Sequence, residues 1–158
     1  MPLSQSAMRV QLALSAIGLQ LEVIELPDST RTSLEAAQAL GCQVGQISKS
    51  IIFKALTTQR PVLVIASGSN RVNEKLIACL VGEEIGKADA DFVRSRTGFV
   101  IGGVPPLGHT EPIETFIDQD LFQYSEIWAA AGTPHAVFQL RPEDLLRMTH
   151  GKLISITG

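Results

Sequence analysis

Hydrophobic residues recur at helical spacing in several stretches of the chain. The first stretch predicts a helix over residues 4–17 that ends at Gly18. Its apolar face is predicted to comprise Ala7, Val10, Leu14 and Ile17. A second helix opens with Thr32 and Glu35 in capping-box spacing and ends at Gly41. Further helices are predicted over 70–82, 90–98 and 142–149. The helix over 70–82 is predicted to bury Val72, Leu76, Ala78 and Leu80.

Short apolar or alternating runs between these stretches predict strands. The run PVLVIAS at 61–67 is almost wholly apolar, so it is predicted to be a central strand. The other strands are predicted over 21–26, 47–56, 99–103, 113–118, 126–131, 136–140 and 152–157, with a short one within 83–89. Helices and strands do not alternate strictly as in repeated βαβ units. The pattern therefore predicts a mixed sheet in a layered α+β (mixed α/β) fold, with residues 1–158 forming a single domain.

A lysine interrupts the strand predicted over 47–56. Successive side chains of a strand point to opposite faces, so Ile47, Lys49, Ile51 and Phe53 share one face. Burying an unpaired ammonium is costly. Lys49 therefore either extends its stem along apolar surface to reach water, or stands in a cleft with a function. The strand taken alone favours the first alternative.

Composition narrows the function classes. The 158-residue chain is 45% hydrophobic and has a mean hydropathy of +0.20, as a compact globular protein does. A net charge of −3 is unlike that of proteins that coat nucleic acid, so any such contact is expected to be local. The longest uncharged run, 97–110, is too short to cross a bilayer. Cys42 and Cys79 lack metal-ligand spacing and are expected to be buried in a reducing, cytoplasmic environment.

A glycine- and proline-rich segment, VIGGVPPLGH at 100–109, is one candidate binding loop. Gly102 and Gly103 allow the backbone to come close to a ligand or to another chain segment. Pro105 and Pro106 stiffen the loop and remove two N–H donors. Taken alone, the segment is more readily a structural turn.

A second candidate loop lies within AAAGTPHAVF at 129–138 and joins two predicted strands. Gly132, Thr133 and His135 bring a hydroxyl and an imidazole to the strand ends, where functional groups are common. Taken alone, His135 is more often a surface histidine. The sequence contains no phosphate loop, dinucleotide fingerprint, nucleophile elbow or zinc-binding helix motif. An enzyme built on this chain is therefore expected to use Lys49 and backbone amides, with neither metal nor cofactor.

Three segments occur in the order and spacing of one known family. They are ISKSIIFK at 47–54, IGGVPPLGH at 101–109 and AAAGTPHAVF at 129–138. With them the chain resembles the YbaK/EbsC family, the free-standing relatives of the editing domain of bacterial prolyl-tRNA synthetase. EAAQALGC and SGSNRVNEKL extend the likeness over nearly the whole chain. The resemblance implies a strongly curved, barrel-like mixed sheet flanked by helices.

The resemblance also implies an activity and a site. It implies deacylation of tRNA charged with a wrong small amino acid, chiefly on proline tRNA. The family's invariant lysine falls on Lys49, which reverses the preference and places that side chain in a cleft, as the catalytic residue that orients the terminal adenosine and the ester. Backbone N–H groups near Gly102 and Gly103 are predicted to receive the developing negative charge. The predicted substrate-binding residues are Ser50, Gly102, Gly103, Val104, Pro105, Pro106, Gly132, Thr133 and His135.

Two positions leave the substrate open. Cysteine-selective members commonly have serine where this chain has Pro105, and the alanine-selective branch usually has asparagine where it has Ser50. Alanine, cysteine and 2-aminobutyrate all stay possible. The expected partner is the acceptor end of tRNA(Pro), with prolyl-tRNA synthetase or an elongation factor as support, and neither DNA nor a membrane. The alternatives are a catalytically idle tRNA- or synthetase-binding module and a generic small-molecule hydrolase.

Overall fold

The computed structural model describes residues 3–27 and 32–158, and within them a mixed β-sheet forms the centre. Its strands are β1 Val23–Glu25, β2 Ile47–Ala55, β3 Pro61–Ser67, β4 Ile85–Lys87, β5 Glu114–Asp118, β6 Ile127–Ala130, β7 Ala136–Leu140 and β8 Lys152–Ile154. The order across the sheet is β1-β7-β6-β2-β3-β5-β8, and β4 pairs with β2 beside this path. The β2–β3 and β6–β7 pairs are antiparallel, whereas β3–β5 and β5–β8 are parallel. The predicted mixed α/β fold is confirmed.

The helices begin and end largely where capping residues predict. They are α1 Gln5–Ala16, α2 Ser33–Leu40, α3 Glu74–Val81, α4 Ala90–Thr97 and α5 Pro142–Thr149, with short 3₁₀ turns η1 Val44–Gln46 and η2 Gln119–Gln123. Thr32 caps α2 by accepting the N–H of Glu35 at 3.1 Å, and Gly41 ends the helix with φ of +68°. The predicted face of α1 is confirmed for its first three positions, whereas Ile17 is exposed. In the described parts of the chain, no helix is both long and apolar enough to cross a membrane.

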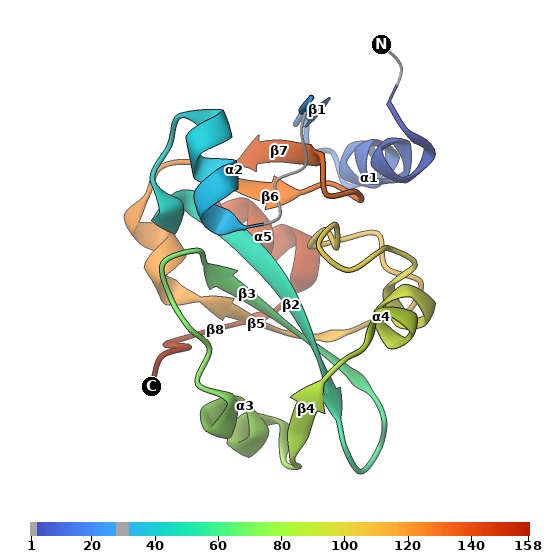
Figure 1. The fold of residues 1–158 in the computed structure, drawn as a ribbon, viewed down its shortest axis with the longest axis vertical. Helices are drawn as coiled ribbons and strands as arrows, with labels where there is room; N and C mark the ends of the chain where they lie inside the picture. The colour runs from blue at the N-terminus through green and yellow to red at the C-terminus, as the bar shows by residue number, and fades with distance from the viewer. Residues whose placement is uncertain (1–2, 28–31) are drawn as a thin grey trace.

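The strand β2 joins the two halves of the sheet. Ser48–Lys54 pairs antiparallel with β3, while Ile47 and Ser48 pair in parallel with β6. In Figure 1, β1, β7 and β6 lie in the upper part of the view and β3, β5 and β8 in the lower part, with β2 crossing between them. β2 is therefore the strand that the two halves of the sheet share.

Two hydrophobic cores cover the two faces of β3. Leu63 and Ile65 pack in a cluster with residues of α1, α4 and α5. Val62 and Val64 point to the other face and pack against α3. Every residue of β3 is buried, which confirms the prediction of a central strand.

The predicted strand over 99–103 is wrong, because the chain turns there. The N–H of Gly103 donates to the carbonyl of Val100 at 3.0 Å, and Gly102 adopts φ of +86°. Phe99 is 1% exposed, but Ile101 is 56% exposed, so the apolar run is not uniformly buried as a central strand would be. The segment is a loop that lies opposite β2.

The predicted apolar face of α3 is also wrong. Asn73 caps the helix by accepting the N–H of Leu76 at 3.2 Å, so Val72 lies before the helix rather than in it. The buried residues of α3 are Ile77 and Val81, and Leu80 is 44% exposed. Cys79 is exposed, contrary to prediction, on the side of the helix away from the core.

Candidate functional site

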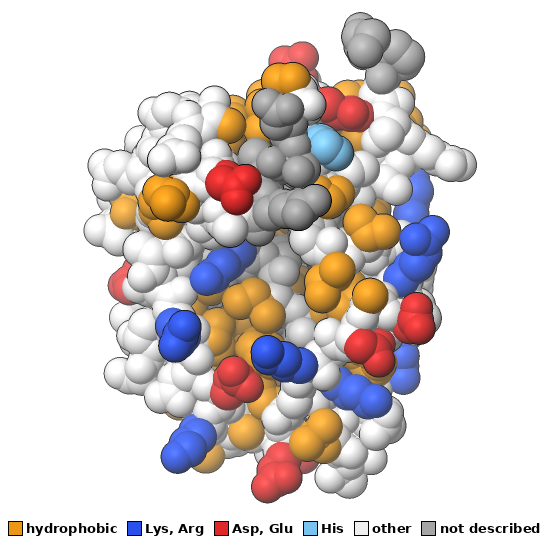
Figure 2. Space-filling model, viewed as in Figure 1, with side chains coloured by type: hydrophobic (Ala, Val, Ile, Leu, Met, Phe, Trp, Pro, Cys, Tyr) orange, Lys and Arg blue, Asp and Glu red, His pale blue; other side chains and the backbone are white. Residues whose placement is uncertain are grey.

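Two cavities meet at β2. The first, of about 360 Å³, lies between β2, α2 and the loop that joins β6 to β7. The second, of about 730 Å³, lies between β2, the loop that follows β3, and β4. Figure 2 shows hydrophobic side chains gathered in a hollow on this face, with Lys and Arg side chains around it. The residues that line both cavities, and thus form the wall between them, are Lys49, Ser50, Gly102 and Val104.

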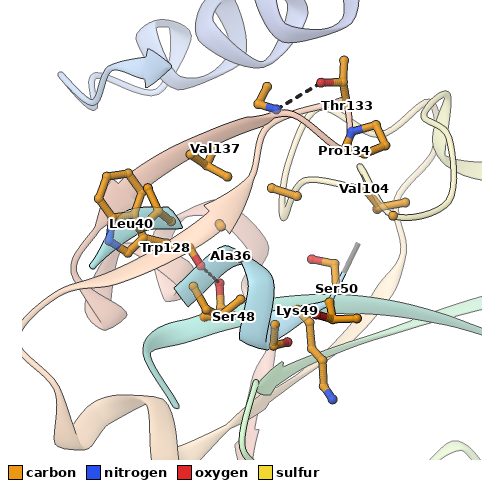
Figure 3. A pocket seen from close by; sticks show the side chains of 17 residues that line it. Ala36, Leu40, Ser48, Lys49, Ser50, Val104, Trp128, Thr133, Pro134 and Val137 are labelled. Carbon is orange, nitrogen blue, oxygen red and sulfur yellow. Dashed lines mark hydrogen bonds between the residues drawn. The ribbon is translucent and has the colours of Figure 1, made fainter. Parts of the chain in front are cut away.

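Lys49 and Ser50 place two kinds of polar group at this shared wall. Figure 3 shows their side chains leaving β2 in opposite directions, with the Ser50 hydroxyl on the side of Val104. Lys49 is half-buried, and its ammonium makes no ion pair or hydrogen bond with the described residues. The lysine therefore stands at a cavity junction with its charge available to a ligand, as the cleft alternative requires.

Apolar side chains form most of the lining of the first cavity. α2 contributes Ala36 and Leu40, and β6 contributes Trp128 and two alanines. Leu40 and Trp128 both pack against the small cluster that seats α2 on the sheet. The hydroxyl of Ser48 donates to the carbonyl of Trp128 at 2.9 Å, which fixes β6 beside the lysine. Sequence reasoning missed Trp128, although it is the one tryptophan of the chain and follows a strand start.

The two glycine loops contact each other directly. The N–H of Gly132 donates to the carbonyl of Gly103 at 2.9 Å. A Cβ on Gly103 would lie 2.7 Å from the Cα of Thr133, and one on Gly132 would lie 2.7 Å from the carbonyl oxygen of Ser6. Both glycines are therefore required for close packing. Gly102 differs, because no atom lies within 4 Å of its Cβ position and it borders both cavities.

Thr133 and His135 separate in the structure. Thr133 lines the first cavity, and its hydroxyl oxygen accepts the N–H groups of His135 and Ala136, each at 3.1 Å. The hydroxyl thus holds its own turn. The side chain of His135 is exposed and lines neither of the two cavities.

The prolines of the other loop lie behind the wall. Pro105 and Pro106 are buried and border neither the first nor the second cavity. The carbonyl of Pro105 lies 2.7 Å from Nε2 of His109, which is placed to donate to it. His109 thus anchors the segment that follows Val104, a role that sequence reasoning did not assign. Burial lowers the pKa of His109, although its bond to Pro105 acts in the opposite direction.

Replacing His109 with glutamine is expected to reduce the pH dependence of stability between about pH 7 and 5. Because the folded pKa is depressed, only the unfolded chain gains a proton as the pH falls below the ordinary histidine value of about 6.5. The free energy of unfolding of the wild type therefore falls as the pH is lowered through this window. His109→Gln keeps a donor for Pro105 but loses the titration, and urea unfolding at several pH values measures the difference.

His135→Gln provides the matched measurement, because its imidazole is exposed. The change in the pH profile that His109→Gln causes, minus the change that His135→Gln causes, is the part that belongs to burial of a histidine. A His109→Gln profile that overlays the wild type would show that the anchor titrates equally in the folded and unfolded chains.

The backbone donors near the wall differ in availability. The N–H of Gly103 is already bonded to Val100. Within the described residues, the N–H groups of Gly102 and Val104 donate to no other group, and both residues border the two cavities.

The described residues contain no group of three His, Cys, Asp or Glu side chains that could hold a metal ion.

Comparison with known proteins gives the chain its family. The sequence model of the aminoacyl-tRNA editing domain matches residues 27–148. The chain belongs to this family. A solved structure described as a candidate trans-editing enzyme for prolyl-tRNA synthetase is 46% identical, with a TM-score of 0.93 over 99% of both chains. The predicted resemblance to the YbaK/EbsC family is thus confirmed.

Two further relatives of the editing-domain family are informative. EbsC of Enterococcus faecalis, named as a candidate Cys-tRNA(Pro)/Cys-tRNA(Cys) deacylase, is 28% identical over 122 residues, which are 77% of this chain and 74% of EbsC. The proline–tRNA ligase of Limosilactobacillus fermentum is 34% identical over 91 residues, which are 55% of this chain but only 16% of the ligase. Membership of the editing-domain family indicates a deacylase activity, with aminoacyl-tRNA as the class of ligand.

Proposed function

We propose that this chain is a trans-editing hydrolase that cleaves the ester between a small non-cognate amino acid and the terminal ribose of tRNA(Pro). The observation that carries the proposal is the position of Lys49 on the wall between two unlike cavities. An aminoacyl adenosine likewise has a small part and a large part, because an ester joins a small amino acid to a larger nucleoside. The amino acid would occupy the first cavity and the nucleoside the second, so the ester would lie at the wall.

The groups at the wall suit ester hydrolysis. Attack on the ester carbonyl, by water, by the neighbouring ribose hydroxyl or by a substrate thiol, places negative charge on the carbonyl oxygen. The unpaired ammonium of Lys49 would hold the ester and the terminal nucleoside in place. The free N–H groups of Gly102 and Val104 would receive the oxyanion, in place of the N–H of Gly103, which is bonded to Val100.

The walls of the first cavity suit a small unbranched side chain. Ala36, Val104 and Val137 line it, and Pro105 and Pro106 stiffen the segment after Val104. A synthetase pocket built for proline discriminates poorly against smaller residues, because a missing methylene is worth only about 1–3 kcal/mol. A second cavity with rigid walls that admits those smaller esters and excludes proline would supply the remaining selectivity.

The acidic balance of the chain bears on its partners. A net charge of −3 supports only a local contact with tRNA, at the acceptor end. The chain alone would therefore bind free tRNA weakly. Prolyl-tRNA synthetase or an elongation factor would then present the mischarged tRNA to it.

The test is hydrolysis of tRNA(Pro) charged separately with alanine, cysteine, 2-aminobutyrate and proline. We expect at least one of the three small esters to be hydrolysed at least ~10-fold faster than prolyl-tRNA(Pro), since one methylene corresponds to roughly 10–200-fold discrimination. Spontaneous hydrolysis of each ester without protein sets the baseline. Binding of charged tRNA with no hydrolysis above that baseline would instead identify a catalytically idle binding module.

A further inference from the structure

We propose that the second cavity binds the phosphate backbone of the single-stranded 3′ end of the tRNA, with Arg71 and Lys87 as the phosphate-binding residues. The inference rests on the proposed function, because an ester held at Lys49 directs the strand away from the first cavity and into the second. Its ligand is a single-stranded ribonucleotide bound without reading of its base sequence.

The charge around the second cavity is opposite to that of the chain. Among the described residues, Lys49, Arg71 and Lys87 line the cavity and Glu74 is the one acidic residue there, so this part of the lining carries +2. The whole chain carries −3. A local excess of positive charge on an acidic protein attracts phosphate to this place alone.

The three cations of this cavity are among those that have no partner in the described parts of the chain. Most other basic side chains are engaged: Arg60, Arg96 and Arg141 in ion pairs, Arg9 and Lys54 over aromatic rings, and Arg147 with the carbonyl of Ile17. Among the described residues, the cations with no such contact are Lys49, Arg71, Lys75, Lys87, Arg94 and Lys152. Three of these six line one cavity. Their charges are therefore available to a ligand.

Beneath the cations the cavity has an apolar floor. Ile51 and Phe53 of β2 and Ile101 of the opposite loop contribute to it. Nucleobases stack on aromatic side chains whatever the base sequence, and their faces also pack against other apolar groups. A cavity lined by apolar residues and by three cations can hold a base and its phosphates together.

The loop that carries Arg71 is fixed at both ends. The buried carboxylate of Asp118 accepts the backbone N–H of Ser67 and the amide of Asn70, each at 2.9 Å. Beyond Arg71, the N–H of Asn73 donates to the carbonyl of Ile156 at 2.7 Å. The arginine backbone is therefore already ordered before a ligand arrives, so binding sacrifices less conformational entropy.

The experiment compares deacylation by the wild type, Arg71→Gln and Lys87→Gln on the mischarged tRNA(Pro) that the wild type hydrolyses best. Each variant is expected to raise KM by about 3- to 10-fold and to leave kcat within about 2-fold, because phosphate contacts bind ground and transition states alike. Each is also expected to lower the slope of log KM against log salt concentration by about 0.7. Arg94→Gln and Lys152→Gln remove exposed, unpartnered cations elsewhere and should keep the wild-type KM.

A second arm uses the trinucleotide CCA and free adenosine as competitors. The trinucleotide should bind the wild type more tightly than adenosine does, and Arg71→Gln and Lys87→Gln should remove that advantage. If the wild type deacylates but both variants match Arg94→Gln and Lys152→Gln, the phosphate-binding role is wrong and the proposed function stands. If no charged tRNA is hydrolysed, the proposed function fails, and direct titration with the trinucleotide still decides whether these cations bind it.

Discussion

Lys49→Ala is expected to lower kcat/KM for deacylation of the mischarged tRNA(Pro) by about 100- to 1,000-fold. Without the ammonium the ester is no longer held against its oxyanion donors, and loss of such positioning typically costs about 100-fold or more. The folded structure should survive, because the ammonium makes no hydrogen bond or ion pair with the described residues. Single-turnover hydrolysis measures the loss, and thermal unfolding checks that the variant is folded.

Lys54→Ala is the matched control for this prediction. Lys54 lies on the same strand, its ammonium lies 5.3 Å from the centre of the Phe92 ring, and it lines neither of the two cavities. It should keep activity within about 2-fold of the wild type, because it removes an equal charge away from the ester. Equal activity of Lys49→Ala and the wild type would return Lys49 to the role of a lysine that merely extends to water.

Gly103→Ala is expected to lower both stability and activity. The new Cβ would lie 2.7 Å from the Cα of Thr133, in backbone that cannot rotate away as a side chain can. Overpacking of this kind costs about 1–3 kcal/mol. Because Gly103 also accepts the N–H of Gly132, separating the two loops would move Val104 and Thr133 at the first cavity. Urea unfolding and deacylation of the same preparation measure the two effects.

Gly86→Ala separates steric conflict from the general effect of replacing a glycine. Its Cβ would meet the end of the Leu56 side chain at 3.2 Å, and Leu56 is 46% exposed and free to move. Neither Gly103 nor Gly86 has positive φ, so backbone strain is absent from the comparison. A Gly103→Ala protein as stable and active as Gly86→Ala would show that the two loops need not touch.

Local signals predicted most elements of the fold. The capping pair Thr32 and Glu35 placed the start of α2, and the unbroken apolar run at 61–67 identified the central strand. Errors arose where an apolar run did not coincide with an element. The residues at 99–103 look like a strand, but Gly102 turns the chain. Val72 fits a helical face only if the helix includes it, and Asn73 begins the helix after it.

The site was only partly accessible to sequence reasoning. Five of the predicted residues line the first cavity, namely Lys49, Ser50, Gly102, Val104 and Thr133. The second cavity could not be predicted, because its cations come from β2, from the loop after β3 and from β4. Lys87 comes close only through the pairing of β4 with Phe53–Ala55, which no local pattern specifies. Arg71 had a weak signal, as a cation in a polar loop directly after a buried strand.

The lengths of the strands bear on how the protein can be handled. The strands at the two ends of the sheet order, β1 and β8, have three residues each, whereas the inner strands β2 and β3 have nine and seven. Short edges offer few free N–H and C=O groups for pairing with another molecule. The six residues VLVIAS at 62–67 have the composition of an aggregation-prone strand and are covered on both faces while the chain is folded. We therefore expect concentrated folded protein to stay dispersed, and aggregation to begin only when heating exposes β3.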